Sequence, residues 1–298
     1  MSNSSRGFLG VAALLFIACA AITVTWCSSM SGMGGMSMPG GWTLSMTWML
    51  MPGQSWPGAA ASFVGMWVVM MMAMMLPSLV PVLWRYRQAI SRINTPRLDL
   101  LTVLVGVGYF SVWTLPGVGA FPIGLSLATA EMQHPALARA VPLTVSMVVL
   151  VAGLIQLTTW KARQLACCRE VSFCPCTAPT DAASALKYGL QLGIRCVYCC
   201  AGLTAILLVV DVMDLRAMTV LTVAITLERL LPSGVRVARA IGIVTVCGGL
   251  GLFFHCVSPS CYLGTNFIDI GGRAQLADDL QAHESGTLKH QRPRVGFD

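Results

Sequence analysis

Three cysteines stand close together in an apolar segment, GIRCVYCCAGL, at positions 196, 199 and 200. Residues three and four positions apart share one face of a helix, so Cys196, Cys199 and Cys200 are expected side by side. Thiolates are soft ligands that suit Cu(I) and zinc. The spacing predicts a buried soft-metal site, and three packed, inert cysteines are the alternative.

Methionines crowd a second apolar segment, FVGMWVVMMMAMMLPSLVP. At helical spacing they form two adjacent stripes, one of Met66, Met70 and Met74 and one of Met71 and Met75. A thioether is a soft metal ligand, but methionine is also a flexible apolar filler. If this helix faces the three thiols at the same depth, the two segments together form a sulfur-lined pocket for Cu(I).

A further run of methionines lies outside the apolar segments, in CSSMSGMGGMSMPGG. Set in glycine and serine, these side chains have no apolar core to fill. We expect them to capture copper, the alternative being a low-complexity loop whose methionines dip into the membrane interface. The proposed ligands are Met30, Met33, Met36 and Met38.

Four cysteines occur in the segment CCREVSFCPC, on the side predicted to be cytoplasmic. Close thiols in a reducing compartment favour metal binding or redox work over structural bridges. Transfer of a soft metal, a zinc or redox dithiol, and palmitoylated or inert thiols all stay open for Cys167, Cys168, Cys174 and Cys176. On the opposite side, Cys256 and Cys261 predict a disulfide, or a metal site that includes His255.

Charged residues in or near the apolar segments are few, and such residues mark functional sites by default. Glu228 is expected to be buried and to pair with Arg195 or Arg229. Asp211 and Asp214 either support a site or hold a short turn. Arg195 either extends to the membrane surface or marks the start of its span.

Membrane helices have to position all of these groups. The 298 residues are 56% hydrophobic and 10% charged, with a mean hydropathy of +0.73. A soluble domain carries about 25% charged residues, so the composition predicts a polytopic all-α transmembrane bundle. About seven spans are expected, at residues 8–26, 60–83, 98–115, 141–160, 187–210, 215–231 and 238–255. Pro77 and Pro81 predict a kink in the second, with backbone carbonyls facing a cavity.

The distribution of Lys and Arg sets the expected orientation. Segments rich in cations alternate with segments poor in them, which predicts a multi-pass protein of the bacterial inner membrane with a cytoplasmic N-terminus and an external C-terminus. Residues 1–264 would form the transmembrane domain, with a Met-rich outer loop at 27–57 and a Cys-rich cytoplasmic loop at 161–186. Residues 265–298 read as a flexible polar tail. The net charge of +7 therefore indicates no nucleic-acid partner.

Three segments resemble one family, the uncharacterised bacterial family of predicted metal-binding integral membrane proteins. They are MWVVMMMAMMLPSLVPVL, AGLIQLTTWK and GLQLGIRCVYCCAGL, the last running on through VMDLRAMTVLTVAITLER. The resemblance implies a helical membrane bundle that binds metal and implies no known reaction. The family pattern has Gly where Tyr198 stands and Cys where Gln164 stands, so Cys196, Cys199 and Cys200 carry over best.

Together these patterns predict a copper-handling membrane protein in which Cu(I) moves between methionines and thiols, in a direction that the sequence does not fix. No catalytic residue is assigned. Expected partners are the lipid bilayer and a copper chaperone or a membrane complex. Two alternatives remain, a membrane thiol–disulfide oxidoreductase that uses a quinone, and an accessory subunit with no ligand of its own.

Overall fold

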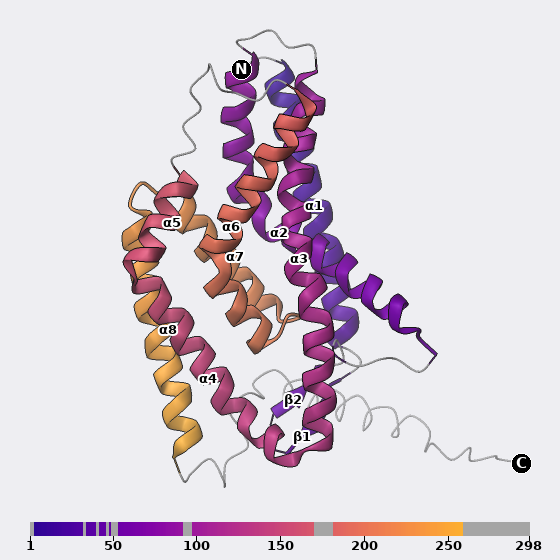
Figure 1. Ribbon diagram of the computed structural model, residues 1–298, viewed down its shortest axis with the longest axis vertical. Helices are drawn as coiled ribbons and strands as arrows, with labels where there is room; N and C mark the ends of the chain where they lie inside the picture. Colours follow the sequence, from indigo (N-terminus) through magenta and orange to yellow (C-terminus); the bar gives the residue numbers. More distant parts are fainter. Residues whose placement is uncertain are drawn as a thin grey trace, which may run out of the picture. The chain divides into compact units, whose positions relative to one another are not determined.

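The computed structural model describes residues 3–31, 34–39, 42–45, 48, 53–91, 97–169 and 181–258. Within these ranges the chain forms eight α-helices and one two-stranded hairpin (Figure 1). The helices are α1 (Asn3–Ser31), α2 (Trp56–Ser91), α3 (Leu98–Gln133), α4 (Pro135–Leu157), α5 (Thr159–Arg169), α6 (Ala182–Val210), α7 (Leu215–Leu230) and α8 (Gly234–Val257). The chain divides into two compact units, Met1–Phe253 and Phe254–Asp298, and the site lies within the first.

The all-α fold expected from the sequence is confirmed, with one difference in the spans. Six of the described helices are long and apolar enough to cross a membrane, namely α1, α2, α3, α4, α6 and α8. The seventh expected span corresponds to α7, which has 16 residues. At about 1.5 Å per residue it is about 24 Å long, short of a hydrocarbon layer of about 30 Å.

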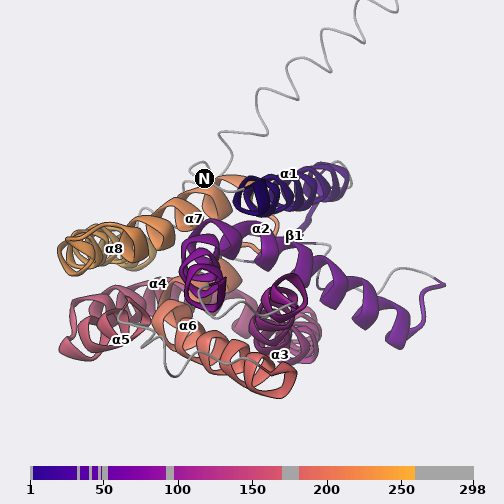
Figure 2. The same cartoon turned by 90° about the horizontal axis from the view of Figure 1, so that it is seen from above.

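Among the described helices of the first unit, α3 and α6 form the most extensive contact. Glycines let the two backbones touch, since a Cβ atom added to Gly189 would lie 2.3 Å from the carbonyl oxygen of Val105. A Cβ atom on Gly108 would likewise lie 2.6 Å from the carbonyl oxygen of Leu186. Helix α6 also packs against α4, α5 and α7, while α2 packs against α1, α3 and α7 (Figure 2).

Helix α2 is bent along its length (Figure 1). It contains Pro77 and Pro81, each of which removes a backbone N–H from the helical hydrogen-bond pattern. The indole Nε1 of Trp67 donates to the carbonyl oxygen of Trp113 at 2.9 Å and ties α2 to α3. The methionine-rich face of α2 is thereby held inside the bundle.

The Met-rich segment contains an antiparallel hairpin of β1 (Met36–Met38) and β2 (Trp42–Leu44). The indole Nε1 of Trp42 donates to the carbonyl oxygen of Ala138 at 2.8 Å, which anchors the hairpin beside α4. Met38 is buried in a small apolar cluster with Leu44 and Ala138. The expectation that these methionines have no core to fill is therefore wrong for Met38.

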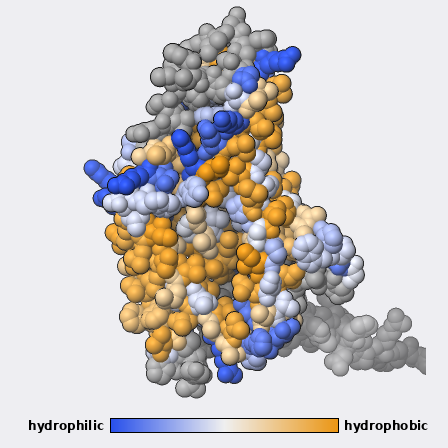
Figure 3. Space-filling view, in the orientation of Figure 1, coloured by the Kyte–Doolittle hydropathy of each residue, from blue (hydrophilic) through white to orange (hydrophobic). Residues whose placement is uncertain are grey.

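In Figure 1 the hairpin lies near the lower end of the first unit, and α5 lies higher up, on the left side. The surface between them is hydrophobic over α4 and α8, with hydrophilic residues gathered at the level of α5 (Figure 3). This banding is what a helical bundle in a lipid bilayer requires.

Candidate metal-binding site

Helix α6 carries the three cysteines on a buried face. Cys196, Cys199 and Cys200 all have exposed fractions of 2% or less. The Sγ atoms of Cys196 and Cys200 are 3.9 Å apart. The i, i+4 spacing read from the sequence therefore does bring these two sulfur atoms together, inside the bundle.

Two polar side chains from other helices meet the sulfur of Cys196. The hydroxyl of Tyr109, on α3, donates to Cys196 Sγ at 2.9 Å. Arg229 Nη1, on α7, donates to the same sulfur at 3.1 Å. Arg229 is buried, and no carboxylate pairs with it among the described residues. A guanidinium beside a thiol favours the thiolate, which is the form that binds metals.

Arg229 also connects the thiols to α2. Its Nη1 donates to the hydroxyl of Ser78 at 2.9 Å, so Ser78 and Cys196 lie at one level of the bundle. Met74 and Met75 lie one helical turn from Ser78, just as Cys200 lies one turn from Cys196. The two methionines and the two cysteines belong to one continuous buried apolar cluster.

A buried ion pair lies beside the other two thiols. Helix α4 ends at Leu157, and the side-chain oxygen of the next residue, Thr158, accepts the N–H of Lys161 at 3.3 Å in the manner of a helix N-cap. The chain turns there and directs Lys161 inward. Its Nζ contacts a carboxylate oxygen of Glu228 at 2.8 Å and donates to the carbonyl oxygen of Cys199 at 2.6 Å.

The expected partners of Glu228 were wrong. Arg195 is exposed, and Arg229 turns to Cys196 instead. Glu228 pairs with Lys161 and also accepts a hydrogen bond from Gln156 Nε2 at 2.8 Å. Sequence reasoning missed Lys161 because it placed this residue in a solvent-exposed loop. The signal available was Glu228 itself, since a buried carboxylate requires a buried cation or donor.

Helix α5 adds a fourth thiol to the site. Cys168 is buried and donates from Sγ to the carbonyl oxygen of Arg195 at 3.2 Å, and its side chain also interacts with that of Cys199. Cys167, one position earlier, is exposed. Cys174 and Cys176 lie outside the described residues. The proposed cytoplasmic ligand group is therefore split, and only Cys168 joins the α6 thiols.

One of the six methionines of α2, Met72, is half-buried, and the other five are buried, as expected for a helix inside the bundle. The buried set comprises Met66, Met70, Met71, Met74 and Met75. They share the apolar cluster that contains the α6 cysteines, but within the described ranges no sulfur hydrogen bond joins the two sets. Direct thioether ligation thus stays a prediction.

A second close pair of sulfur atoms was not predicted. The Sγ of Cys27, on α1, lies 3.7 Å from the Sδ of Met213, in the turn between α6 and α7. Asp211 holds this turn by accepting the N–H of Met213 at 2.9 Å, and burial raises the pKa of the Asp211 carboxyl. Asp214 caps α7, accepting the N–H of Arg216 at 2.8 Å.

The remaining predicted ligands are dispersed. Met30 is half-buried against the core cluster, and Met36 is exposed on β1. Met33 lies outside the described residues. So does Cys261, which leaves the predicted disulfide with Cys256 as a prediction.

The α6 cysteines and Cys168 together form the thiol cluster. This cluster suits a soft metal ion that binds two or three ligands better than a metal ion that requires more. A metal bonded to two thiolates at about 2.3 Å requires sulfur atoms no more than about 4.6 Å apart, and the Cys196–Cys200 separation of 3.9 Å meets this. Over the described ranges, no three His, Cys, Asp or Glu side chains converge as a ready-made site. Two close thiols suit Cu(I), which soft sulfur ligands select.

Over the described residues, the fold and the site define a helical protein with six apolar helices of membrane-spanning length and a buried thiol cluster linked to a cation, Arg229, that no carboxylate pairs with. Residues 64–252 match the family model described as PpoB2, copper chaperone, and the chain belongs to this family. The match begins within α2 and runs to Leu252 in α8, which includes every residue of the thiol cluster. Comparisons with curated proteins and with solved structures find no match.

Proposed function

We propose that this chain binds Cu(I) as its cargo at the thiols of α6, inside a bacterial inner membrane. Cys196 and Cys200 are the principal ligands, and Cys199 and Cys168 are close enough to exchange with them. Membership of a copper-chaperone family supports the choice of metal.

The observation that carries the proposal is the buried guanidinium of Arg229 on the sulfur of Cys196. A buried cation is costly unless an opposite charge offsets it. Glu228 is already neutralised by Lys161, so it does not serve Arg229. Two thiolates and one Cu(I) carry a net charge of −1, which Arg229 offsets. The charge of the surroundings thus matches a copper–dithiolate complex.

Around this site we propose a route for the ion. The hairpin methionines and the Cys27–Met213 pair are soft groups outside the α6 thiols. The α2 methionines, Cys168 and the Cys27–Met213 pair share one buried cluster with the α6 thiols. Thioethers offer weak, uncharged sites along which Cu(I) can exchange, and thiolates offer the tighter ones.

Metal analysis of the full-length protein, purified anaerobically in detergent, tests the proposal. Wild-type protein should retain Cu(I) against a competing chelator, bathocuproine disulfonate. The triple variant Cys196→Ser, Cys199→Ser, Cys200→Ser should lose it, because serine offers no soft ligand. Cys247→Ser, at an exposed position of α8, is the matched control and should retain copper.

Two other results would replace the proposal. Quinone-dependent thiol turnover by copper-free wild-type protein would favour a thiol–disulfide oxidoreductase. Equal copper content in the triple variant and the wild type, with no such turnover, would favour an accessory role without a ligand at these cysteines.

A further inference from the structure

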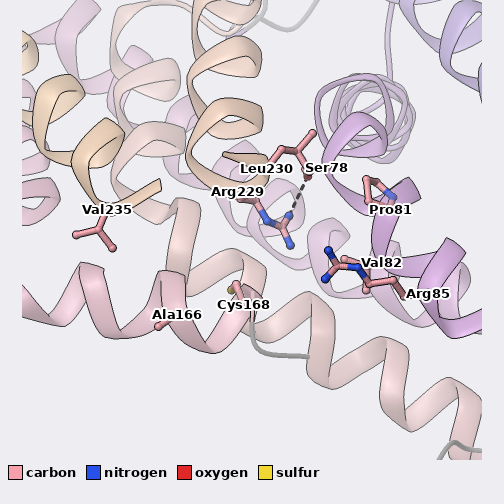
Figure 4. Close-up of a pocket in the computed structure, with 9 residues that line it drawn as sticks. All are labelled: Ser78, Pro81, Val82, Arg85, Ala166, Cys168, Arg229, Leu230 and Val235. Atoms are coloured by element: carbon pink, nitrogen blue, oxygen red, sulfur yellow. Dashed lines mark hydrogen bonds between the residues drawn. The ribbon is translucent and has the colours of Figure 1, made fainter. Parts of the chain in front are cut away.

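A cavity of about 390 Å³ lies beside the thiol cluster and is lined in part by α5 (Figure 4). Its volume is within the range of small-molecule sites, about 300–1,000 Å³. The lining residues come from four helices that are distant in sequence. They are Ser78, Pro81, Val82, Arg85, Ala166, Cys168, Arg229, Leu230 and Val235.

Two arginines give this cavity a positive charge. Arg85 extends from α2 and Arg229 from α7, with their guanidinium groups turned toward one another in Figure 4. The lining set includes no Asp or Glu. Facing guanidinium groups repel one another unless an anion lies between them, and carboxylates fit such groups through paired hydrogen bonds.

An unsatisfied donor marks where the anion would bind. Arg229 uses Nη1 for Ser78, Tyr109 and Cys196. Its other terminal nitrogen, Nη2, is buried and has no hydrogen-bond partner among the described residues. Leaving a buried charged donor unpaired is costly, so a ligand that accepts from Nη2 would bind favourably.

The same cavity gives access to a thiol of the cluster. Cys168 lines the cavity, and its side chain also interacts with Cys199. A ligand bound between the two arginines would therefore lie next to the sulfur of Cys168, which in turn interacts with Cys199 on α6. This arrangement joins anion recognition to soft-metal chemistry within one small space.

We propose that the cavity binds a small thiol bearing carboxylate groups, and that this thiol exchanges Cu(I) with Cys168. The inference rests on the proposed function and names the carrier for that site. The carboxylates bind between Arg85 and Arg229, and the carrier's sulfur faces Cys168.

The exchange is a ligand substitution with no change in oxidation state. A bond forms between Cys168 Sγ and Cu(I) as the bond between the carrier's sulfur and Cu(I) breaks. The proton of the Cys168 thiol passes to the departing carrier thiolate, which leaves as a thiol. The reverse sequence unloads the protein.

Copper loading from two carriers tests this inference. Glutathione carries two carboxylates, whereas 2-mercaptoethanol carries none. We expect Arg85→Gln to slow Cu(I) loading from the glutathione complex about tenfold, the size of one charged hydrogen bond. Loading from the 2-mercaptoethanol complex should change less than about twofold. Arg239→Gln, which removes an exposed arginine outside the cavity, should affect neither.

Direct binding gives a second readout that needs no copper. In equilibrium dialysis, S-methylglutathione should bind the wild type about tenfold more tightly than Arg85→Gln. Equal loading from glutathione in both proteins, with equal binding, would overturn the inference while leaving the copper site intact. Displacement of S-methylglutathione by equimolar inorganic phosphate would also overturn it, and would indicate a general phosphate or lipid-headgroup site. If the wild-type protein takes up Cu(I) from neither carrier, the proposed function is overturned as well.

Discussion

The buried sulfur atoms of α6 and those of α2 share one apolar cluster but have different surroundings. The sulfur of Cys196 is contacted by Arg229 and Tyr109, and Lys161 donates to the backbone carbonyl oxygen of Cys199. The α2 methionines neighbour aromatic residues, such as the stacked Phe63 and Trp67. A thiol can lose its proton and become an anion, whereas a thioether cannot. Buried cationic side chains can therefore offset the charge of the α6 thiols, and the α2 thioethers need no such partner.

The largest effect is expected from breaking the ion pair on the thiol side. Lys161→Met leaves Glu228 buried without its cation and should lower the free energy of unfolding by about 3–5 kcal/mol. The double variant Lys161→Met, Glu228→Gln removes both charges and should recover most of this loss. Thermal unfolding in detergent measures both. Equal stability of the wild type and Lys161→Met would mean that the pair contributes nothing.

The second-largest effect is expected from removing Arg229, the cation at Cys196, which should weaken copper binding. For Arg229→Gln we expect a tenfold to hundredfold lower Cu(I) affinity, roughly the 1.5–3 kcal/mol of a charged hydrogen bond. Arg229→Lys keeps the charge and should recover part of the loss. Competitive chelator titration gives the affinities, and Arg216→Gln, exposed on the same helix, is the control. An unchanged affinity in Arg229→Gln would contradict the charge argument.

The thioether side should respond more weakly. Met74→Leu combined with Met75→Leu conserves volume, so each swap should cost less than about 1.5 kcal/mol of stability. If a thioether completes the coordination, Cu(I) affinity should fall about tenfold. Met218→Leu, buried on α7, is the matched control. Equal affinity in both variants would assign the α2 methionines to packing alone.

The smallest effect concerns the turn that holds Met213. Burial raises the pKa of Asp211, so the folded state takes up a proton more readily than the unfolded state. Its contribution to stability is therefore fully present below the ordinary Asp pKa of about 3.9 and is lost as pH rises through the folded pKa. Asp211→Asn should flatten this decline, measured by thermal unfolding from about pH 4 upward. If the stability of the wild type and of Asp211→Asn changes with pH in the same way, Asp211 makes no such contribution.

Hydropathy and helical spacing were enough to predict the helices and the burial of the α6 thiols. Apolar runs near 20 residues have few structural alternatives in a chain with so little charge. The i, i+3, i+4 pattern of Cys196, Cys199 and Cys200 depends on local geometry alone. Each of these features depends on one continuous segment of the chain, so it can be predicted from the sequence without knowledge of tertiary contacts.

The polar part of the site was less predictable because it depends on tertiary contacts. Lys161 follows an apolar span and resembles a loop residue, yet the break at Thr158 turns it toward Glu228, 67 positions further along the chain. The partner of Arg229 is a sulfur on a different helix. The alignment of the α2 thioethers with the α6 thiols stays a prediction, and sequence reasoning did not foresee the arginine that links the two helices.

The contact of α3 and α6 through Gly108 and Gly189 limits how this protein can move. Two helices whose backbones touch cannot rock or slide past one another without a steric clash, so they behave as a fixed frame. Under the proposed function, an opening that admits Cu(I) would come from helices that pack against this pair, such as α5 and α7. Those helices carry Cys168 and Arg229, so movement of either helix would change the surroundings of the proposed ligands.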